Sequence, residues 1–243
     1  MLKIRLDQLI LKKCFAPNLE KARAIIGAGE VFVDEVVSDK PGQLIPADSH
    51  IRIKEKCPYV SRGGLKLEKG ISFFKISPAG KICLDIGASS GGFTDCLLKH
   101  NAKKVYAVDV AYGQLAWKLR QNQKVVTLER FNARNIKRTD LEERIDLAVI
   151  DASFISITKL IPPLLPLFKN TVAILALIKP QFELPPDKIA SGGVVRDPDL
   201  HLEAISKIEM FVGKTGLGDR GSVESPILGP KGNKEFLMFI TSH

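Results

Sequence analysis

The sequence has few cysteines, one tryptophan, three methionines and no long apolar run. Its four cysteines, at positions 14, 57, 83 and 96, lack the paired spacing of a zinc site and the density of a disulfide framework. We therefore expect free thiols and no metal site. The longest apolar run, 172–178, is too short to span a bilayer, and the first residues do not read as a signal peptide. We expect a cytoplasmic protein that does not act on membranes.

Basic charge is what the chain has in excess. Lysine and arginine number 36 against 27 aspartates and glutamates, which gives a net charge of +9. An excess of this size indicates a polyanionic partner, with nucleic acid as the first candidate and an anionic membrane surface as the second. The excess is densest in residues 61–80, which carry four basic residues and one acidic residue. The sequence gives no indication of the oligomeric state.

Residues 1–60 predict a small α+β module. Apolar residues recur with helical spacing over 4–13, and Asn18 is suited to cap a second helix over 19–26. Residues rich in β-branched side chains at 31–37 and an alternating segment at 50–54 then predict a small hairpin. A module of this length is only marginally stable by itself.

Several short stretches of this module resemble the α-L RNA-binding motif first described in a small-subunit ribosomal protein. They are Arg5-Leu6-Asp7, Lys21-Ala22-Arg23 and Gly29-Glu30-Val31. The resemblance covers residues 3–54 and implies that basic residues near the second helix contact RNA phosphates. The same residues could instead be solvated charges on a helix face, since phosphate contact requires only clustered cations. The predicted RNA contacts are Arg5, Lys12, Lys13, Lys21, Arg23 and, beyond the module, Arg62.

A glycine-rich turn follows the apolar segment 81–86, and helical spacing begins at Phe93. This order predicts a strand, a turn at its carboxyl end and a helix, the place where open α/β sheets bind ligands. A dinucleotide fingerprint would need glycine at position 89, where the chain has serine. The form Asp-x-Gly-x-x-x-Gly-Gly-Phe instead resembles the first motif of S-adenosylmethionine-dependent methyltransferases. We therefore expect S-adenosylmethionine as the cofactor.

Three of the predicted cofactor contacts have an expected partner on that molecule. Asp85 would hold the amino end of the methionine part, directly or through water. Asp109 ends the next strand, and its carboxylate can accept from two ribose hydroxyls. Asn132, or Ala133 beside it, lies on a loop suited to the adenine. The full predicted set is Asp85, Gly87, Ser89, Gly91, Gly92, Phe93, Asp109 and Asn132.

Apolar segments alternate with helical ones through the rest of the chain, which predicts a doubly wound α/β domain over residues 61–243. Its first part, 61–80, would be a basic interdomain linker and a first helix. Further strands are expected at 105–110, 124–128, 145–150 and 171–178, and an amphipathic helix at 200–215. We expect a Rossmann-like methyltransferase sheet that is mostly parallel, with an antiparallel last strand.

Four charged residues lie where this sheet would bring them to one edge: Lys66, Asp151, Lys179 and Glu235. A lone lysine after a strand is usually a solvated end and a lone aspartate is usually a cap, but four such residues are harder to explain in that way. They resemble the Lys-Asp-Lys-Glu tetrad of FtsJ-like RNA ribose 2′-O-methyltransferases. With the α-L module and the stretches 61–67, 153–156 and 229–237, the whole chain resembles the TlyA family, often labelled hemolysin A.

This resemblance implies methylation of cytidine 2′-hydroxyls in large-subunit ribosomal RNA and, for some members, also in small-subunit ribosomal RNA. The short N-terminal extension favours the large-subunit type. Lys179 is expected to orient and deprotonate the hydroxyl, with Lys66 beside it, while Asp151 and Glu235 hold the two ammonium groups. The expected partners are ribosomal RNA or ribosomal subunits.

Other functions remain open on the sequence alone. A membrane-acting cytolysin would need an apolar span, an exposed amphipathic segment or a secretion signal, none of which is evident. The intact tetrad and the cofactor motif argue against the hypothesis of an RNA-binding protein without enzymatic activity. A base methyltransferase would be expected to carry an Asn/Asp-Pro-Pro-aromatic or catalytic cysteine signature, and residues 151–154 do not match one.

Overall fold

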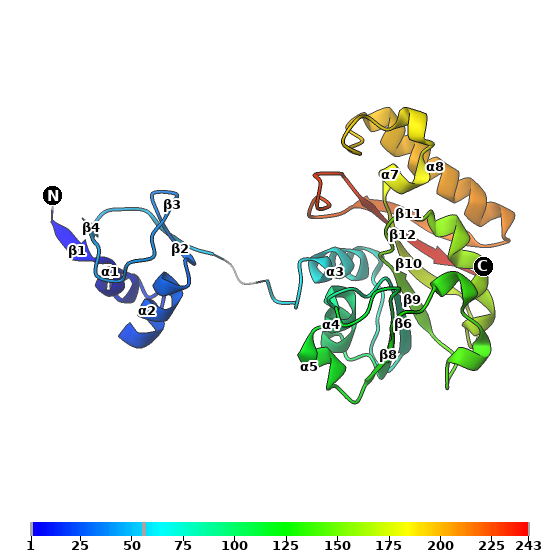
Figure 1. Cartoon of the computed structure of the whole chain (residues 1–243), viewed down its shortest axis with the longest axis horizontal. Helices are drawn as coiled ribbons and strands as arrows, with labels where there is room; N and C mark the ends of the chain where they lie inside the picture. The colour runs from blue at the N-terminus through cyan, green and yellow to red at the C-terminus, as the bar shows by residue number, and fades with distance from the viewer. Residues whose placement is uncertain (1, 55–56, 243) are drawn as a thin grey trace. The chain divides into compact units, whose positions relative to one another are not determined.

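A computed structural model describes residues 2–54 and 57–242 of the chain. The chain forms two compact units, Met1–Lys56 and Cys57–His243 (Figure 1). The division lies a few residues before the predicted boundary at 60. Neither described range contains a helix that is both long enough and apolar enough to cross a membrane.

The N-terminal unit is a small α+β fold. Its two helices pack against a three-stranded sheet of order β3-β2-β5 and a separate antiparallel pair, β1 with β4. The Asn18 side chain accepts a hydrogen bond from the Lys21 amide at 2.8 Å, so the predicted cap is confirmed. The elements are β1 Lys3–Arg5, α1 Leu6–Lys12, α2 Leu19–Gly27, β2 Val31–Val33, β3 Val36–Val37, β4 Leu44–Pro46 and β5 Ile51–Ile53.

The prediction of one helix over 4–13 was wrong at its start. Residues Lys3–Arg5 are extended because they pair with β4, where Ile4 lies opposite Ile45. Strands β1 and β4 have three residues each, too few for an alternating pattern to be visible in the sequence. The helix therefore begins at Leu6, whose side chain is fully buried with those of Leu9 and Ile10.

The C-terminal unit is built on a seven-stranded sheet of order β11-β12-β10-β9-β6-β7-β8. All pairs from β8 to β10 are parallel, whereas β12 runs antiparallel to both β10 and β11, so the predicted antiparallel last strand is confirmed. The strands are β6 Ile82–Ile86, β7 Lys104–Val108, β8 Val125–Leu128, β9 Leu147–Ile150, β10 Ala173–Ile178, β11 Gly218–Glu224 and β12 Phe236–Thr241.

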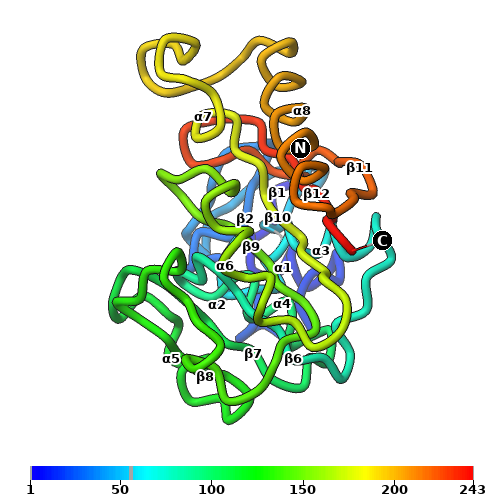
Figure 2. The backbone as a smooth tube through the Cα atoms, turned by 90° about the vertical axis from the view of Figure 1, so that its right-hand side faces the viewer, coloured from blue at the N-terminus to red at the C-terminus, as the bar shows by residue number. Residues whose placement is uncertain are grey.

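Helices cover both faces of this sheet, and the layers are visible in Figures 1 and 2. Side chains alternate along each strand, so Leu84 and Ala148 belong to one apolar cluster, with α6 and α8, while Cys83 and Leu147 belong to the other, with α3 and α4. The helices are α3 Gly63–Phe74, α4 Gly92–Lys99, α5 Trp117–Arg120, α6 Ile161–Leu164, α7 Pro180–Glu183 and α8 Pro198–Lys214.

The strand order reverses between β6 and β9. The chain proceeds from β6 outward through β7 and β8, and then continues on the other side from β9 to β10. In a doubly wound sheet, ligands bind outside the carboxyl ends of the strands at such a reversal. The glycine-rich turn after β6 and Asp151 after β9 both lie there.

Candidate active site

The turn after β6 is closely packed against the end of β9. Gly87 has a φ of +84°, and a Cβ atom built on it would lie 2.6 Å from the Asp151 carbonyl oxygen. An L side chain is disfavoured by that backbone conformation and has no space at that distance. Glycine at this position therefore lets the two strand ends meet at the reversal point.

A cavity of about 1070 Å³ opens at this edge of the sheet. Four of the predicted cofactor contacts line it: Gly87, Ser89, Asp109 and Asn132, with Ala133 beside them. The Asp109 carboxylate accepts hydrogen bonds from the Ser89 amide at 2.7 Å and the Ala111 amide at 2.8 Å, one on each oxygen. Each oxygen keeps a second lone pair, so the fixed carboxylate has the capacity to accept from two hydroxyl groups.

Asp85 lies beneath the turn and not on the wall of this cavity. Its side chain is fully buried; one oxygen accepts from the Thr94 hydroxyl at 2.6 Å, and the other has no hydrogen-bond partner among the described residues. Burial raises the pKa of Asp85 to about 7. An unpartnered buried carboxylate oxygen fits a cationic group in the site, such as the amino group of S-adenosylmethionine.

Three other predicted contacts contribute to a second cavity of about 240 Å³ or to the packing around it. Gly92 and Phe93 line it, together with Arg62 and Lys66 of the preceding segment. Phe93 is largely buried in the apolar layer between α4 and the sheet. Gly91 has a φ of +94° and lets the chain enter α4.

The structure brings the four charged residues of the predicted tetrad together. Lys179 Nζ lies 2.5 Å from Asp151 Oδ1, and Lys66 Nζ lies 2.5 Å from Glu235 Oε2. The second Asp151 oxygen is 4.0 Å from Lys66 Nζ, so this carboxylate faces both ammonium groups. Lys66 and Lys179 are each 7% exposed and Glu235 is 1% exposed.

This cluster combines two buried cations with two carboxylates, so its formal charges balance. Burial of such groups is tolerable only when they are paired, and each lysine here has a carboxylate at hydrogen-bond distance. Asp151 lines both cavities, and Lys66 lines the smaller one. The arrangement can therefore present an amine to a group bound beside the turn and hold it by its carboxylate partner.

Two residues near Lys179 have contacts that the sequence patterns did not predict. The Lys179 ammonium donates to Ser153 Oγ at 3.1 Å. Glu183, in α7, is 2% exposed and accepts from the Ser156 hydroxyl at 2.5 Å and the Ile157 amide at 2.9 Å. The stretch 153–156 is one of the motifs that carry the family resemblance, but no pattern predicts which of its side chains contacts the lysine.

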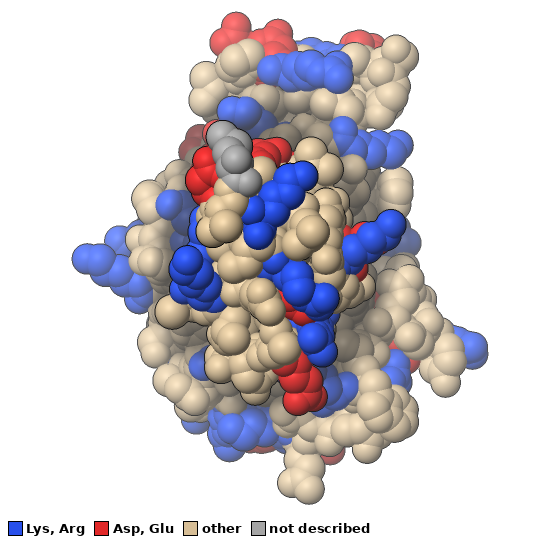
Figure 3. Space-filling model, turned by 90° about the vertical axis from the view of Figure 1, so that its left-hand side faces the viewer, with Lys and Arg blue, Asp and Glu red and all other residues tan. Residues whose placement is uncertain are grey.

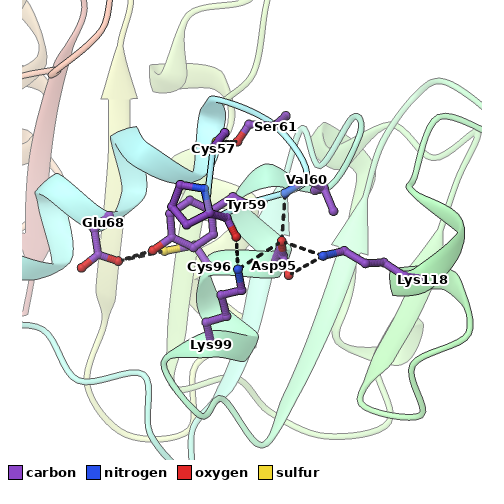
Figure 4. Close-up of polar contacts among 10 residues, drawn as sticks. Cys57, Tyr59, Val60, Ser61, Glu68, Asp95, Cys96, Lys99 and Lys118 are labelled. Atoms are coloured by element: carbon purple, nitrogen blue, oxygen red, sulfur yellow. Dashed lines mark hydrogen bonds and ion pairs between the residues drawn. The ribbon is translucent and has the colours of Figure 1, made fainter. Parts of the chain in front are cut away.

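The segment that leads into α3 is fixed to both α3 and α4 by polar contacts (Figure 4). The Val60 amide donates to Asp95 Oδ2 at 2.9 Å, and the Tyr59 hydroxyl donates to Glu68. A Cβ atom on Gly64 would lie 2.2 Å from the Tyr59 ring, which shows how closely the ring covers the start of α3. This segment therefore holds the helix that carries Lys66.

Three side chains near Tyr59 have atoms that could bind a metal ion within 4.8 Å of one another: Glu68, Cys96 and His100. His100 Nε2 lies 2.7 Å from Glu68 Oε2, and burial raises the pKa of the Cys96 thiol to about 12. The hydrogen bonds among these groups account for their proximity without an ion. The expectation of no metal site stays a prediction.

The predicted RNA contacts of the N-terminal unit differ in their surroundings. Arg5 and Arg23 both donate to the buried Asp7 carboxylate, at 2.8–3.0 Å, and Lys13 donates to the Ser49 carbonyl. Lys12 and Lys21 are exposed, and no contact of their ammonium groups is found within the described ranges. Figure 3 shows several basic side chains on the surface of this unit, with a few acidic ones between them.

Comparison with known proteins places this geometry in a family. Residues 59–241 match the model of the FtsJ-like methyltransferases. The chain is 44% identical to YqxC of Bacillus subtilis, over 98% of this chain and 85% of that protein. It is 42% identical to hemolysin A of Brachyspira hyodysenteriae, over 96% of this chain and 98% of the relative.

A third relative has a more specific name. The chain is 37% identical to the 16S/23S rRNA (cytidine-2′-O)-methyltransferase TlyA of Mycobacterium tuberculosis, over 97% of this chain and 89% of that enzyme. Among solved structures, one from Streptococcus thermophilus matches with a TM-score of 0.76 at 40% identity, covering 100% of this chain and 89% of that one.

Proposed function

Because the chain belongs to the FtsJ-like methyltransferase family, together with relatives named TlyA and hemolysin A, we propose that it methylates the ribose 2′-hydroxyl of cytidine in ribosomal RNA. The chain is a methyltransferase, and its methyl donor is S-adenosylmethionine. The substrate is proposed from the relative named a 16S/23S rRNA (cytidine-2′-O)-methyltransferase. Such a substrate would place the reaction in the cytoplasm.

The observation that carries the proposal is the buried pairing of Lys179 with Asp151, a residue that lines the cofactor cavity. A ribose hydroxyl is a poor nucleophile and must lose its proton as it attacks a methyl group. Lys179 would accept this proton, and Asp151 would hold its side chain against rotation. Bound S-adenosylmethionine would supply an electrophilic methyl group on a positively charged sulfur.

The other two members of the cluster would support this pair. Lys66 faces the second Asp151 oxygen at 4.0 Å and is itself held by Glu235 at 2.5 Å. The shared Asp151 carboxylate would keep both lysine side chains in place. We expect Glu235→Gln to weaken this arrangement without removing the proposed base.

The cofactor contacts follow from the lining of the cavity. Asp109 would accept from the ribose hydroxyls of S-adenosylmethionine, and Asn132 or Ala133 would lie at the adenine. The unpartnered oxygen of Asp85 would receive the methionine amino group, directly or through water. Basic residues of the N-terminal unit, above all the exposed Lys12 and Lys21, would contact RNA phosphates.

The test is transfer of labelled methyl groups from S-adenosylmethionine to ribosomal subunits that lack the modification, with Lys179→Ala as control. We expect label in the large subunit, with the small subunit assayed in parallel, and none with the variant. If the wild-type chain transfers no methyl group to either subunit, the proposal is wrong.

Membrane lysis is the second candidate because one relative is named hemolysin A. The paired Lys-Asp cluster and the cofactor cavity have no role in such an activity. Haemoglobin release from erythrocytes, measured with the wild-type chain and with Lys179→Ala, separates the two candidates. Lysis by both proteins at equal strength, without methyl transfer by either, would favour the second.

A further inference from the structure

Lys179 has a second hydrogen-bond acceptor that lies outside the four-residue cluster. Its ammonium group donates to Asp151 Oδ1 at 2.5 Å and to Ser153 Oγ at 3.1 Å. Ser153 is exposed and lines the cofactor cavity. The two acceptors of the Lys179 ammonium group, Asp151 and Ser153, therefore both lie on the wall of this cavity.

We propose that Ser153 is a positioning residue, which sets the direction of the Lys179 lone pair during methyl transfer. The inference rests on the proposed role of Lys179 as base. A neutral amine has two N–H donors and one lone pair in a tetrahedral arrangement. When Asp151 and Ser153 each accept one N–H, the lone pair can occupy only the remaining direction.

Without Ser153 the amine would keep a single fixed contact. With only the bond to Asp151, rotation about the Cε–Nζ bond would exchange the second N–H and the lone pair between two directions. A proton acceptor that points away from the hydroxyl for part of the time is a slower base, because orientation contributes directly to the rate. Asp151 alone therefore leaves the amine incompletely oriented.

The loop that carries Ser153 is held at both ends. At its start, the Asp151 amide donates to the Ile86 carbonyl at 2.9 Å. At its end, Glu183 accepts from the Ser156 hydroxyl and the Ile157 amide. Since Glu183 belongs to α7, which begins directly after Lys179, it fixes the serine loop to the element that carries the lysine.

Phe154 gives a second indication that the loop conformation is imposed by its surroundings. Its φ is +63°, in the left-handed region that a bulky side chain rarely adopts. Its ring lies 5.1 Å from that of Phe182, centroid to centroid, so α7 contacts the loop here too. Backbone strain of this kind persists only where neighbouring contacts maintain it, and it is concentrated at functional sites.

The proposed step transfers one methyl group and one proton. Lys179 first loses one ammonium proton to solvent and is then neutral. The 2′-hydroxyl oxygen forms a bond to the methyl carbon as the bond from that carbon to sulfur breaks, and sulfur keeps the electron pair. The hydroxyl proton passes to the Nζ lone pair of Lys179, while Asp151 and Ser153 remain acceptors of the other two N–H groups.

The experiment measures single-turnover methyl transfer to ribosomal subunits, with steady-state kcat and KM for the RNA substrate. The variants are Ser153→Ala, Ser153→Thr and Lys179→Ala, and the control is Ser72→Ala at an exposed position of α3. We expect Ser153→Ala to lower the transfer rate about tenfold, equivalent to about 1.4 kcal/mol. KM and cofactor affinity should not change, and Ser153→Thr should restore most of the rate.

Three results would contradict the inference, and they are distinguishable. If Ser153→Ala retains the wild-type rate while Lys179→Ala is inactive, Ser153 has no positioning role but the proposed function stands. A higher KM without a lower rate would make Ser153 an RNA contact instead. Wild-type activity of Lys179→Ala would overturn the proposed base and this inference together.

Discussion

The protonation state of the buried Asp85 carboxyl group can be tested directly. Burial raises its pKa to about 7, and one of its oxygens has no partner among the described residues. Below pH 7 the carboxyl is protonated and cannot attract a cation, whereas above pH 7 it is charged. If it receives the methionine amino group, binding of the cofactor favours the charged form.

We therefore predict that affinity for S-adenosylmethionine falls as the pH is lowered from 8 to 6. Near pH 7, binding should release protons, which calorimetry in two buffers of different ionisation enthalpy measures directly. Asp85→Asn should bind more weakly at pH 8 and lose this pH dependence. An unchanged pH dependence in Asp85→Asn would contradict the assignment.

Gly87 tests the close approach of the two strand ends. Gly87→Ala places a Cβ atom 2.6 Å from the Asp151 carbonyl oxygen and forces alanine into a φ of +84°. The left-handed conformation alone costs about 1–2 kcal/mol, and the contact adds to that cost. We predict a lower melting temperature and weaker cofactor binding.

Gly80→Ala is the matched control for that substitution. Gly80 also has a positive φ, +72°, but a Cβ atom there would meet no atom within 4 Å. It should show the conformational cost alone and retain cofactor affinity. Equal loss of stability and binding in both variants would mean that the contact with Asp151 is unimportant.

At the scale of single elements, α1 carries a buried carboxylate that joins three parts of the N-terminal unit. Asp7 accepts from Arg5 of β1 and Arg23 of α2, and the hydrogen bonds from Arg5, the largest cause, lower its pKa to about 2. A lowered pKa means that this contribution to stability is complete above the ordinary value of 3.8 and is lost as the pH falls towards 2.

We predict that residues 2–54 lose protection against hydrogen exchange between pH 4 and pH 2, in step with protonation of Asp7. Asp7→Asn should remove this pH dependence and lower affinity for RNA, because neither arginine is then held in place. If Asp7→Asn leaves both the protection profile and RNA affinity unchanged, the two ion pairs do not organise the unit.

The elements that could be predicted from the sequence are those with a strong apolar pattern. The central strands β6, β9 and β10 are buried on both faces, so their apolar runs are continuous and visible. Strands β1 and β4 are too short to show a pattern. Strand β11 lies at the sheet edge with a polar, glycine-containing sequence, so nothing in it indicated a strand.

The same limit applies to the site. Lys179 and Asp151 follow strands, and strand ends of a parallel sheet meet at one edge, so their proximity could be predicted. The contact of Ser153 with Lys179 depends on the left-handed backbone of Phe154 and on Glu183 from another element. No local pattern encodes a loop conformation that is fixed by residues distant in the chain.

At the scale of the whole molecule, we propose that the N-terminal unit attaches to RNA and that the C-terminal unit carries out methyl transfer. The double variant Lys12→Ala, Lys21→Ala should weaken binding of ribosomal RNA. It should also reduce the slope of log affinity against log salt concentration by about 1 per lost phosphate contact. Affinity for S-adenosylmethionine should not change. The control is Lys118→Ala, which removes a cation that is already paired. It should leave the slope of log affinity against log salt concentration unaltered.

The central claim is that the methyl group is placed on a ribose oxygen of cytidine. The most direct test digests RNA from treated large subunits to nucleosides and identifies the methylated product by mass spectrometry. We predict 2′-O-methylcytidine with the wild-type chain and none with Lys179→Ala. A methyl group on a base, or 2′-O-methylcytidine formed equally by Lys179→Ala, would contradict it.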